Sequence, residues 1–168
     1  SFDESLAAVI EQRVESTGAD GKLLLDKNSN VYQVNLLEKL LVPLLSKLSN
    51  LVVDGGIWLN TQRPEWNDAN NALVGQGLSM VTLNYLRRYV AFLSDLLRDY
   101  TVEITLSNEV KQWLDRTLSI LVELLPQLDH KPISAALRFT ILTRLGQAAS
   151  DFRLNVYQQQ GFSGTSLG

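Results

Sequence analysis

The chain has 168 residues, of which 45% are hydrophobic and 20% charged, and its formal net charge is −3. These values are ordinary for a soluble globular domain, and no basic run or nucleic-acid motif accompanies them, so we expect no nucleic-acid partner. The chain contains no cysteine and one histidine, which excludes a disulfide framework, a thiolate site and a multi-histidine metal site.

The N-terminal part of the chain predicts two helices. Apolar residues at helical spacing indicate the first helix over residues 3–16, with Asp3 as its N-cap. Two glycines in residues 17–21 (T-G-A-D-G) predict a turn after it. A leucine-rich stripe at spacings of three and four indicates the second helix over residues 32–52, and we expect Pro43 to kink or split this helix.

A short extended segment and a long helix follow. Residues 57–62 alternate apolar and polar side chains, which is the period of a strand. The next helix is predicted over residues 77–99, and both it and the helix over 32–52 have broad apolar stripes, so we expect these two to be the central pair. The inward residues expected on the later helix are Leu78, Val81, Thr82, Tyr85, Leu86, Tyr89, Phe92, Leu93, Leu96 and Leu97.

Two further helices are predicted in the C-terminal part. The first begins after a cap at Ser107 or Asn108 and runs to about residue 125, ahead of a turn that contains Pro126. The last is predicted over residues 133–157. We therefore expect an all-α fold of about five helices, joined as antiparallel hairpins, with less than about a tenth of the residues in strands.

The expected domain organisation is one helical domain over residues 1–157. Residues 158–168 are rich in Gln, Gly and Ser and predict a flexible tail. No apolar run reaches the about 18 residues of a membrane span, so we expect a soluble protein with no membrane contact. The N-terminus lacks a secretory signal, which favours the cytoplasm as the compartment.

The stretch from 63 to 79, R-P-E-W-N-D-A-N-N-A-L-V-G-Q-G-L-S, differs from the leucine-rich remainder. Pro64 restricts the backbone around it, so the segment should begin as a loop. Carboxylate, amide and guanidinium groups surround Trp66, whose ring face suits the C–H face of a pyranose and whose N–H can donate a hydrogen bond. This combination indicates a carbohydrate site.

The segment resembles a loop of the cellobiose and chitobiose phosphorylases, Asp-Trp-Asn-Asp-Gly-x-Asn, which is followed by a Gly-rich turn, a Ser and a long helix. The resemblance covers about residues 55–97. Glu65 stands where that family has Asp, and Ala69 stands where it has Gly. The matching residues in this chain are Glu65, Trp66, Asn67, Asp68, Ala69, Asn70, Asn71, Gly75, Gly77 and Ser79.

The resemblance implies a glycoside phosphorylase or hydrolase. Asp68 matches the general acid of the family, and we expect Glu65 to tune its protonation or to hold a sugar hydroxyl. The implied partners are an oligosaccharide and inorganic phosphate, with no metal or cofactor. The substrate-binding residues that we expect are Arg63, Trp66, Asn67, Asn70 and Asn71.

The resemblance also implies a toroid of six α-hairpins. Five helices supply at most half of such a toroid, so we expect this chain alone to be catalytically incomplete. Either it belongs with the remainder of a larger chain, or the loop survives on a helical domain without the full reaction.

A second interpretation is a non-catalytic helical module that serves protein interaction or an accessory role. Pro, Asn, Asp and Gly are common turn formers, and Trp66 could fill a core rather than bind a ligand. Asp68 would then cap the following helix. The location of these side chains decides between the two, because a catalytic Asp68 must line an open pocket.

Overall fold

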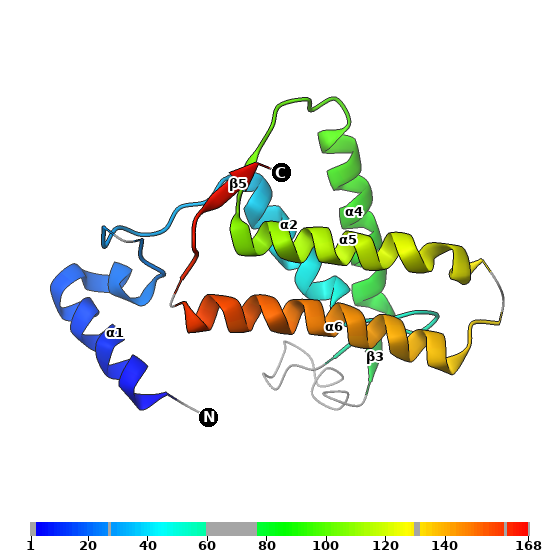
Figure 1. The fold of residues 1–168 in the computed structure, drawn as a ribbon, viewed down its shortest axis with the longest axis horizontal. Coiled ribbons are helices and arrows are strands. Elements are labelled where there is room, and N and C mark those ends of the chain that lie inside the picture. The colour runs from blue at the N-terminus through cyan, green and yellow to red at the C-terminus, as the bar shows by residue number, and fades with distance from the viewer. Residues whose placement is uncertain (1–2, 27, 60–76, 130–131, 160, 168) are drawn as a thin grey trace.

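The computed structural model describes residues 3–26, 28–59, 77–129, 132–159 and 161–167, and these form a mostly helical fold (Figure 1). The mostly helical character expected from the sequence is confirmed. No helix in these ranges is long and apolar enough to cross a membrane. The α-helices of the described ranges are α1 (Glu4–Thr17), α2 (Leu36–Leu48), α4 (Met80–Leu97), α5 (Asn108–Leu128) and α6 (Ala135–Gln158), and the 3-10 helix η1 (Gly18–Lys22) follows α1.

Two small antiparallel sheets accompany the helices, so the all-α expectation holds only in its coarse form. The first sheet has the order β1 (Leu51–Val52), β2 (Gly56–Trp58) and β3 (Leu78–Ser79). The second pairs β4 (Thr105–Ser107) with β5 (Thr165–Leu167). β5 belongs to the segment that was expected to be a flexible tail. Its hydrogen-bonded partner, β4, lies about 60 residues earlier in the sequence, so the pattern of residues near β5 does not predict this pairing.

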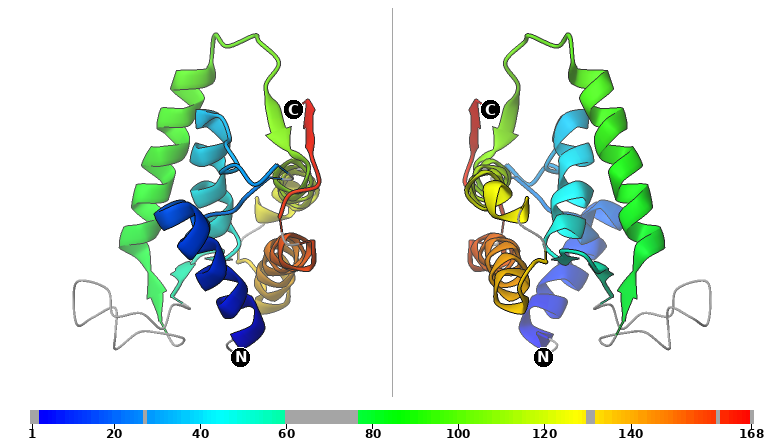
Figure 2. Two further views of the ribbon diagram at one scale, coloured as in Figure 1. Left: turned by 90° about the vertical axis from the view of Figure 1, so that its left-hand side faces the viewer. Right: turned by 90° about the vertical axis from the view of Figure 1, so that its right-hand side faces the viewer.

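The core lies where α2 meets the α5–α6 hairpin. α5 and α6 run antiparallel side by side, and α2 lies between this hairpin and α4 (Figures 1 and 2). Trp113 of α5 stacks on Phe152 of α6 with a centroid separation of 4.5 Å, and such a pair adds to the burial energy of both rings. The buried members of this core are Leu45, Trp113, Ile120, Leu124, Ile141, Leu145, Ala148 and Ala149.

α4 packs at the edge of the fold rather than in its centre. Leu86 and Leu93 are buried as expected, and the Tyr89 hydroxyl donates to the Leu40 carbonyl of α2 at 2.9 Å. The expectation that α2 and α4 form the central pair is wrong for α4, because the α5–α6 hairpin covers the other side of α2. As a result, several residues expected inward on the predicted helix over 77–99 are exposed, namely Leu78 of β3 and Val81, Tyr85, Phe92 and Leu96 of α4.

Two prolines lie inside helices that continue past them. α2 is shorter than expected but continues through Pro43, with buried Leu41 and Leu45 on either side of it. α5 runs through Pro126, which the sequence placed in a turn, and ends at Leu128. A proline removes one backbone donor from a helix, and packing on both sides of Pro43 offsets that loss.

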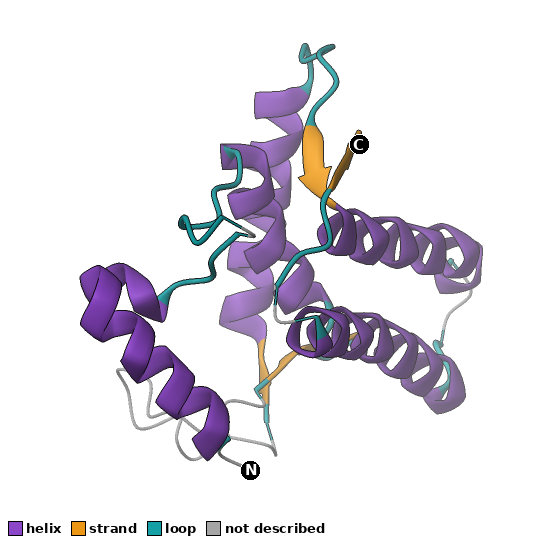
Figure 3. Ribbon diagram, turned by 60° about the vertical axis from the view of Figure 1, so that its left-hand side comes forward, coloured by secondary structure: helices purple, strands orange, loops and turns teal. Residues whose placement is uncertain are grey.

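α1 begins as expected, because the Asp3 side chain accepts a hydrogen bond from the Leu6 amide at 2.9 Å. It has no buried residue, and it packs on η1 apart from the other helices (Figure 3). Gly21 of η1 makes this packing possible, because a Cβ there would lie 2.6 Å from the backbone of Arg13.

Candidate functional site

The catalytic and binding residues expected from the sequence lie outside the described residues. Their spatial relation is therefore untested, and their roles remain predictions. This holds for both candidate catalytic carboxyls and for all five candidate sugar-binding side chains: Arg63, Glu65, Trp66, Asn67, Asp68, Asn70 and Asn71.

The two flanks of this segment are described, and they lie side by side. β2 and β3 pair antiparallel, with Trp58 opposite Leu78, and the Leu59 amide donates to the Gly77 carbonyl at 3.0 Å. The two strands approach closely at Gly56, where φ is +140° and a Cβ would lie 3.0 Å from the Ser79 carbonyl oxygen. The segment between Leu59 and Gly77 therefore starts and ends at one hydrogen-bonded point.

Ser79 connects this point to α4. Its Oγ accepts hydrogen bonds from the Thr82 amide at 3.0 Å and from the Thr82 hydroxyl at 2.8 Å, so it is the N-cap of the helix. Ser79, which the resemblance matched to the serine after the Gly-rich turn, therefore has a structural role in this chain as a helix cap.

A groove of about 430 Å³ lies beside these strands, between the first sheet and α6. Trp58 borders it with 37% of its surface exposed, and the Trp58 amide is held by the Asn50 carbonyl at 2.8 Å. Strand alternation explains the exposure, because Ile57 points into the core and Trp58 to the opposite face. The groove is lined by Ser49, Asn50, Trp58, Phe139, Leu142, Thr143, Gly146, Ala149 and Arg153.

The polar groups of the groove can both donate hydrogen bonds to a ligand and accept hydrogen bonds from it. The Asn50 amide nitrogen donates to the Ser46 carbonyl at 3.1 Å and to the Ser49 hydroxyl at 3.3 Å, which fixes the orientation of its side chain. The hydrogen bond from the Trp58 amide goes to the backbone carbonyl of Asn50. No described residue donates to the side-chain oxygen, Oδ1, which remains an acceptor. The exposed Arg153 guanidinium makes no ion pair with a described residue and offers a fork of donors.

The carboxylates of Glu123 and Asp151 are hydrogen-bonded to side chains of α5 and α6. Arg144 of α6 forms a two-pronged hydrogen bond with Glu123 of α5 at 2.8 and 2.7 Å, and this bond lowers the pKa of Glu123. The pKa of Asp151 is also lowered, first by the hydrogen bond from Gln147 and then by that from Arg116. None of the groove-lining residues in the described ranges is an acid, so these residues can bind a neutral polyol or an anion but cannot protonate a leaving group.

The sequence predicted an extended segment at Trp58 but no binding role for it. Its surroundings come from three separate segments, with Asn50 after α2, Trp58 in β2 and Arg153 in α6. The only local signal was the alternation around Trp58, which predicts one exposed face. Asn50 and Arg153 had no signal, since their proximity depends on the packing of α6 against the first sheet.

A buried polar cluster lies elsewhere, at the N-terminal ends of α2 and α5. Glu38 is 3% exposed and accepts hydrogen bonds from the Ser107 amide at 2.8 Å and from the Ser107 hydroxyl at 2.6 Å. The Tyr32 hydroxyl lies 3.0 Å from the same Ser107 oxygen. All three groups are satisfied within the protein, so this cluster joins two helices rather than offering a site.

Comparison with known proteins found no protein-family model and no curated protein that matches the chain.

Proposed function

We propose that this chain is a carbohydrate-binding helical domain that forms part of a glycoside phosphorylase or hydrolase. The groove beside Trp58 is the observation that supports this proposal most directly. It combines an exposed indole face with amide, hydroxyl and guanidinium groups, which is the chemistry that a pyranose ring requires. Trp58 also directly precedes Leu59, whose amide donates to the carbonyl of Gly77 on the other side of the predicted sugar-binding segment in the sequence.

The catalytic part of the proposal rests on the family resemblance. Asp68 would act as the general acid that protonates the bridging oxygen, and phosphate could take the place of a second catalytic carboxylate. Glu65 would support Asp68, and Arg63 would bind phosphate or a sugar hydroxyl. In this division the groove binds sugar, since none of its described lining residues is an acid, and Asp68 supplies the proton.

We also propose that the helices form part of an α/α toroid. The antiparallel α5–α6 hairpin is the kind of unit from which such toroids are built. An apolar row on the outer side of α5 supports a neighbouring hairpin there, because Leu118, Val122 and Leu125 are each more than half exposed.

Sugar binding can be tested by NMR on the ¹⁵N-labelled chain. The protein has three tryptophans, so its indole N–H region contains few signals, and Trp58→Phe assigns the one from the groove. Cellobiose and chitobiose are the probes, and an equal concentration of glycerol is the control for general polyol effects. We expect the Trp58 indole signal to shift with either disaccharide in a saturable manner.

The matched variant pair is Trp58→Ala and Tyr100→Ala. Tyr100 is also exposed, at 54%, but lies away from the groove. Loss of an aromatic platform worth about 1.5 kcal/mol weakens binding about tenfold, so we expect this change for Trp58→Ala only. A Trp58 signal that is unmoved by both sugars, or equal affinities of the two variants, would rule out the groove as the sugar site.

A further inference from the structure

The outer side of α4 has a second apolar stripe, which faces away from the core. Its apolar members are Val81, Tyr85 and Phe92, which are 66%, 65% and 55% exposed. They follow one another at intervals of four and seven residues, so they lie on one face of the helix, about 100° around it from the buried Leu86 and Leu93. We call this face the outer stripe of α4.

No described element covers the outer stripe. α4 contacts α2 on its inner side and β2 at its beginning, and both views in Figure 2 show it along the outer edge of the molecule. Single exposed apolar residues are normal on a protein surface, but several of them on one face of a helix mark a surface that binds another one.

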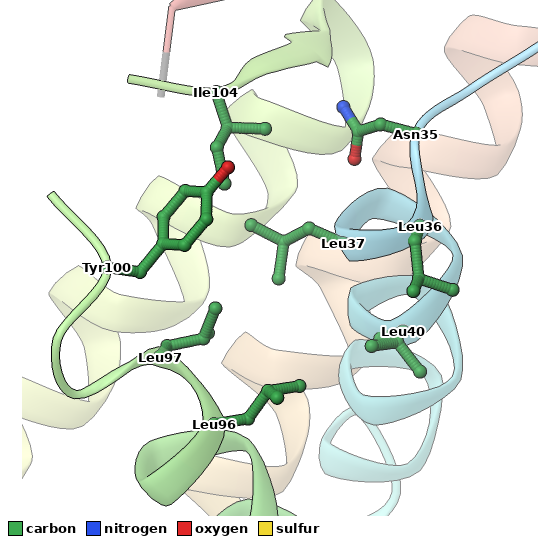
Figure 4. A pocket seen from close by; sticks show the side chains of 8 residues that line it. All are labelled: Asn35, Leu36, Leu37, Leu40, Leu96, Leu97, Tyr100 and Ile104. Carbon is green, nitrogen blue, oxygen red and sulfur yellow. The ribbon is translucent and has the colours of Figure 1, made fainter. Parts of the chain in front are cut away.

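An apolar groove of about 370 Å³ extends this surface toward α2 (Figure 4). Leu96 and Tyr100 border it from the α4 side, while Leu36 and Leu40 border it from α2. Leu36 is 69% exposed, which is unusual for a leucine on the side of a helix that faces a neighbouring helix. The surface available to a partner is therefore wider than one helix face.

The charges on the outer stripe show which partner fits it. Arg88 lies four residues before Phe92 and Asp95 lies three residues after it, on the same face of the helix. A second α4 that crosses antiparallel at Phe92 reverses this order. It therefore places its Asp95 opposite Arg88 and its Arg88 opposite Asp95. The stripe is thus complementary in charge to a copy of itself.

We propose that the outer stripe of α4 is an interface between two copies of this chain, related by a two-fold axis at Phe92. A two-fold interface is built from one patch that matches itself, and an apolar centre with opposite charges on its two sides meets that condition. Within one chain Arg88 lies 5.9 Å from the ring centroid of Tyr85, and Asp95 pairs with exposed Arg98. Both groups remain on the surface and accessible to a second copy.

The size of the surface sets the expected affinity. α4 has 18 residues, which corresponds to a length of about 27 Å. One helix face of this length offers less than the about 800 Å² per partner of a standard interface, so the apolar groove must contribute as well. We expect a dimer with a dissociation constant in the micromolar range.

Sedimentation velocity over a series of micromolar concentrations tests the proposal on the intact 168-residue chain. We expect the weight-average mass to rise from monomer to dimer with concentration. Phe92→Glu places two carboxylates at the axis, and we expect it to keep the chain monomeric at concentrations where the wild type is dimeric. Far-UV circular dichroism establishes that each variant is folded, which is expected because all the altered side chains are exposed.

Charge exchange provides the sharper test. Arg88→Asp or Asp95→Arg alone puts like charges opposite each other, and each should raise the dissociation constant about tenfold. The double variant Arg88→Asp with Asp95→Arg restores opposite charges and should recover most of the lost association. Arg87→Asp is the matched control, since Arg87 is exposed but lies about 100° around the helix from Arg88, and it should change the association little.

Three results would overturn the proposal: a wild type that stays monomeric across the series, a dimer unaffected by Phe92→Glu, or single charge variants that the double variant does not rescue. If the chain stays monomeric, the outer stripe of α4 does not bind a second copy and would instead bind a segment of a different protein. Because no residue of this stripe lines the sugar groove, the outcome is independent of the carbohydrate experiment.

Discussion

Removal of the Glu38 carboxylate is predicted to destabilise the fold strongly. Glu38→Ala leaves the Ser107 amide and hydroxyl without their acceptor in a place where Ser107 is 0% exposed and Glu38 3%. A hydrogen bond to a charged group contributes about 1.5–3 kcal/mol, and a buried donor left without a partner costs about 1–3 kcal/mol. With two such bonds lost, we expect the free energy of unfolding to fall by about 3–5 kcal/mol.

Partial variants of the same cluster should give graded effects. Ser107→Ala removes the hydroxyl but keeps the backbone donor, so its cost should be about half that of Glu38→Ala. Glu38→Gln keeps one acceptor oxygen and should be intermediate. A double-mutant cycle between Glu38→Ala and Ser107→Ala should give a coupling energy of about 1–3 kcal/mol, since the two side chains touch directly at 2.6 Å.

Urea unfolding followed by far-UV circular dichroism measures these differences. Glu11→Ala is the matched control, because Glu11 is an exposed glutamate in a helix and should change the free energy by no more than about 0.5 kcal/mol. If Glu38→Ala costs no more than Glu11→Ala, then the carboxylate does not join α2 to β4 and the reasoning is wrong.

Three further predictions concern the core, the α5–α6 hairpin and the candidate acid. Leu41→Ala should lower the free energy of unfolding by about 2–5 kcal/mol, because Leu41 is buried in α2; an unchanged urea midpoint would contradict this. The pKa of Glu123 is lowered by the hydrogen bond from Arg144, so its contribution to stability is complete at neutral pH, begins to fall near the usual glutamate pKa of about 4.3, and is lost as the pH passes through the lowered folded-state value. Urea midpoints of wild type and Glu123→Gln should therefore differ at neutral pH and converge in acid, and a constant difference would refute the assignment. If the protein that contains this segment is the proposed glycoside enzyme, Asp68→Asn should reduce its turnover about 10²–10⁴-fold without changing the thermal midpoint, and Glu65→Gln should reduce it less; full turnover by Asp68→Asn would show that Asp68 is not the acid.

The sequence by itself determined the positions of the helices, because the signals for them lie within a few consecutive residues. The Asp3 cap and the apolar spacing after it predicted α1 to within a residue at each end. The last helix, predicted over 133–157, forms as Ala135–Gln158. The helix predicted over 32–52 forms only as Leu36–Leu48, and it is not split at Pro43. The turn predicted at Pro126 is wrong, because α5 continues through that residue and packing of the whole helix outweighs the local preference for a break.

Burial of apolar residues was predictable only in part. Leu41 and Leu86 were expected inward and are buried, whereas Val81 and Phe92 were expected inward and are exposed. A periodic stripe shows that one face of a helix is apolar. On α4 this apolar face is wider than the part of it that α2 covers. Which part of the stripe is covered depends on where the neighbouring helices pack, and this cannot be predicted from the residues of α4 alone.

The candidate sites show the same division. The predicted role of the segment around Asp68 follows from a resemblance in consecutive residues, and it stays a prediction. The groove beside Trp58, by contrast, was decided by tertiary structure, because it brings together residues of β2 and α6 that are far apart in the chain. The same holds for Glu38. In the sequence it only interrupts a leucine stripe, and its hydrogen-bond partner, Ser107, lies 69 residues later. Local hydrogen bonds are encoded by neighbours in the sequence, whereas burial and pairing of polar groups depend on contacts that form only when distant segments pack.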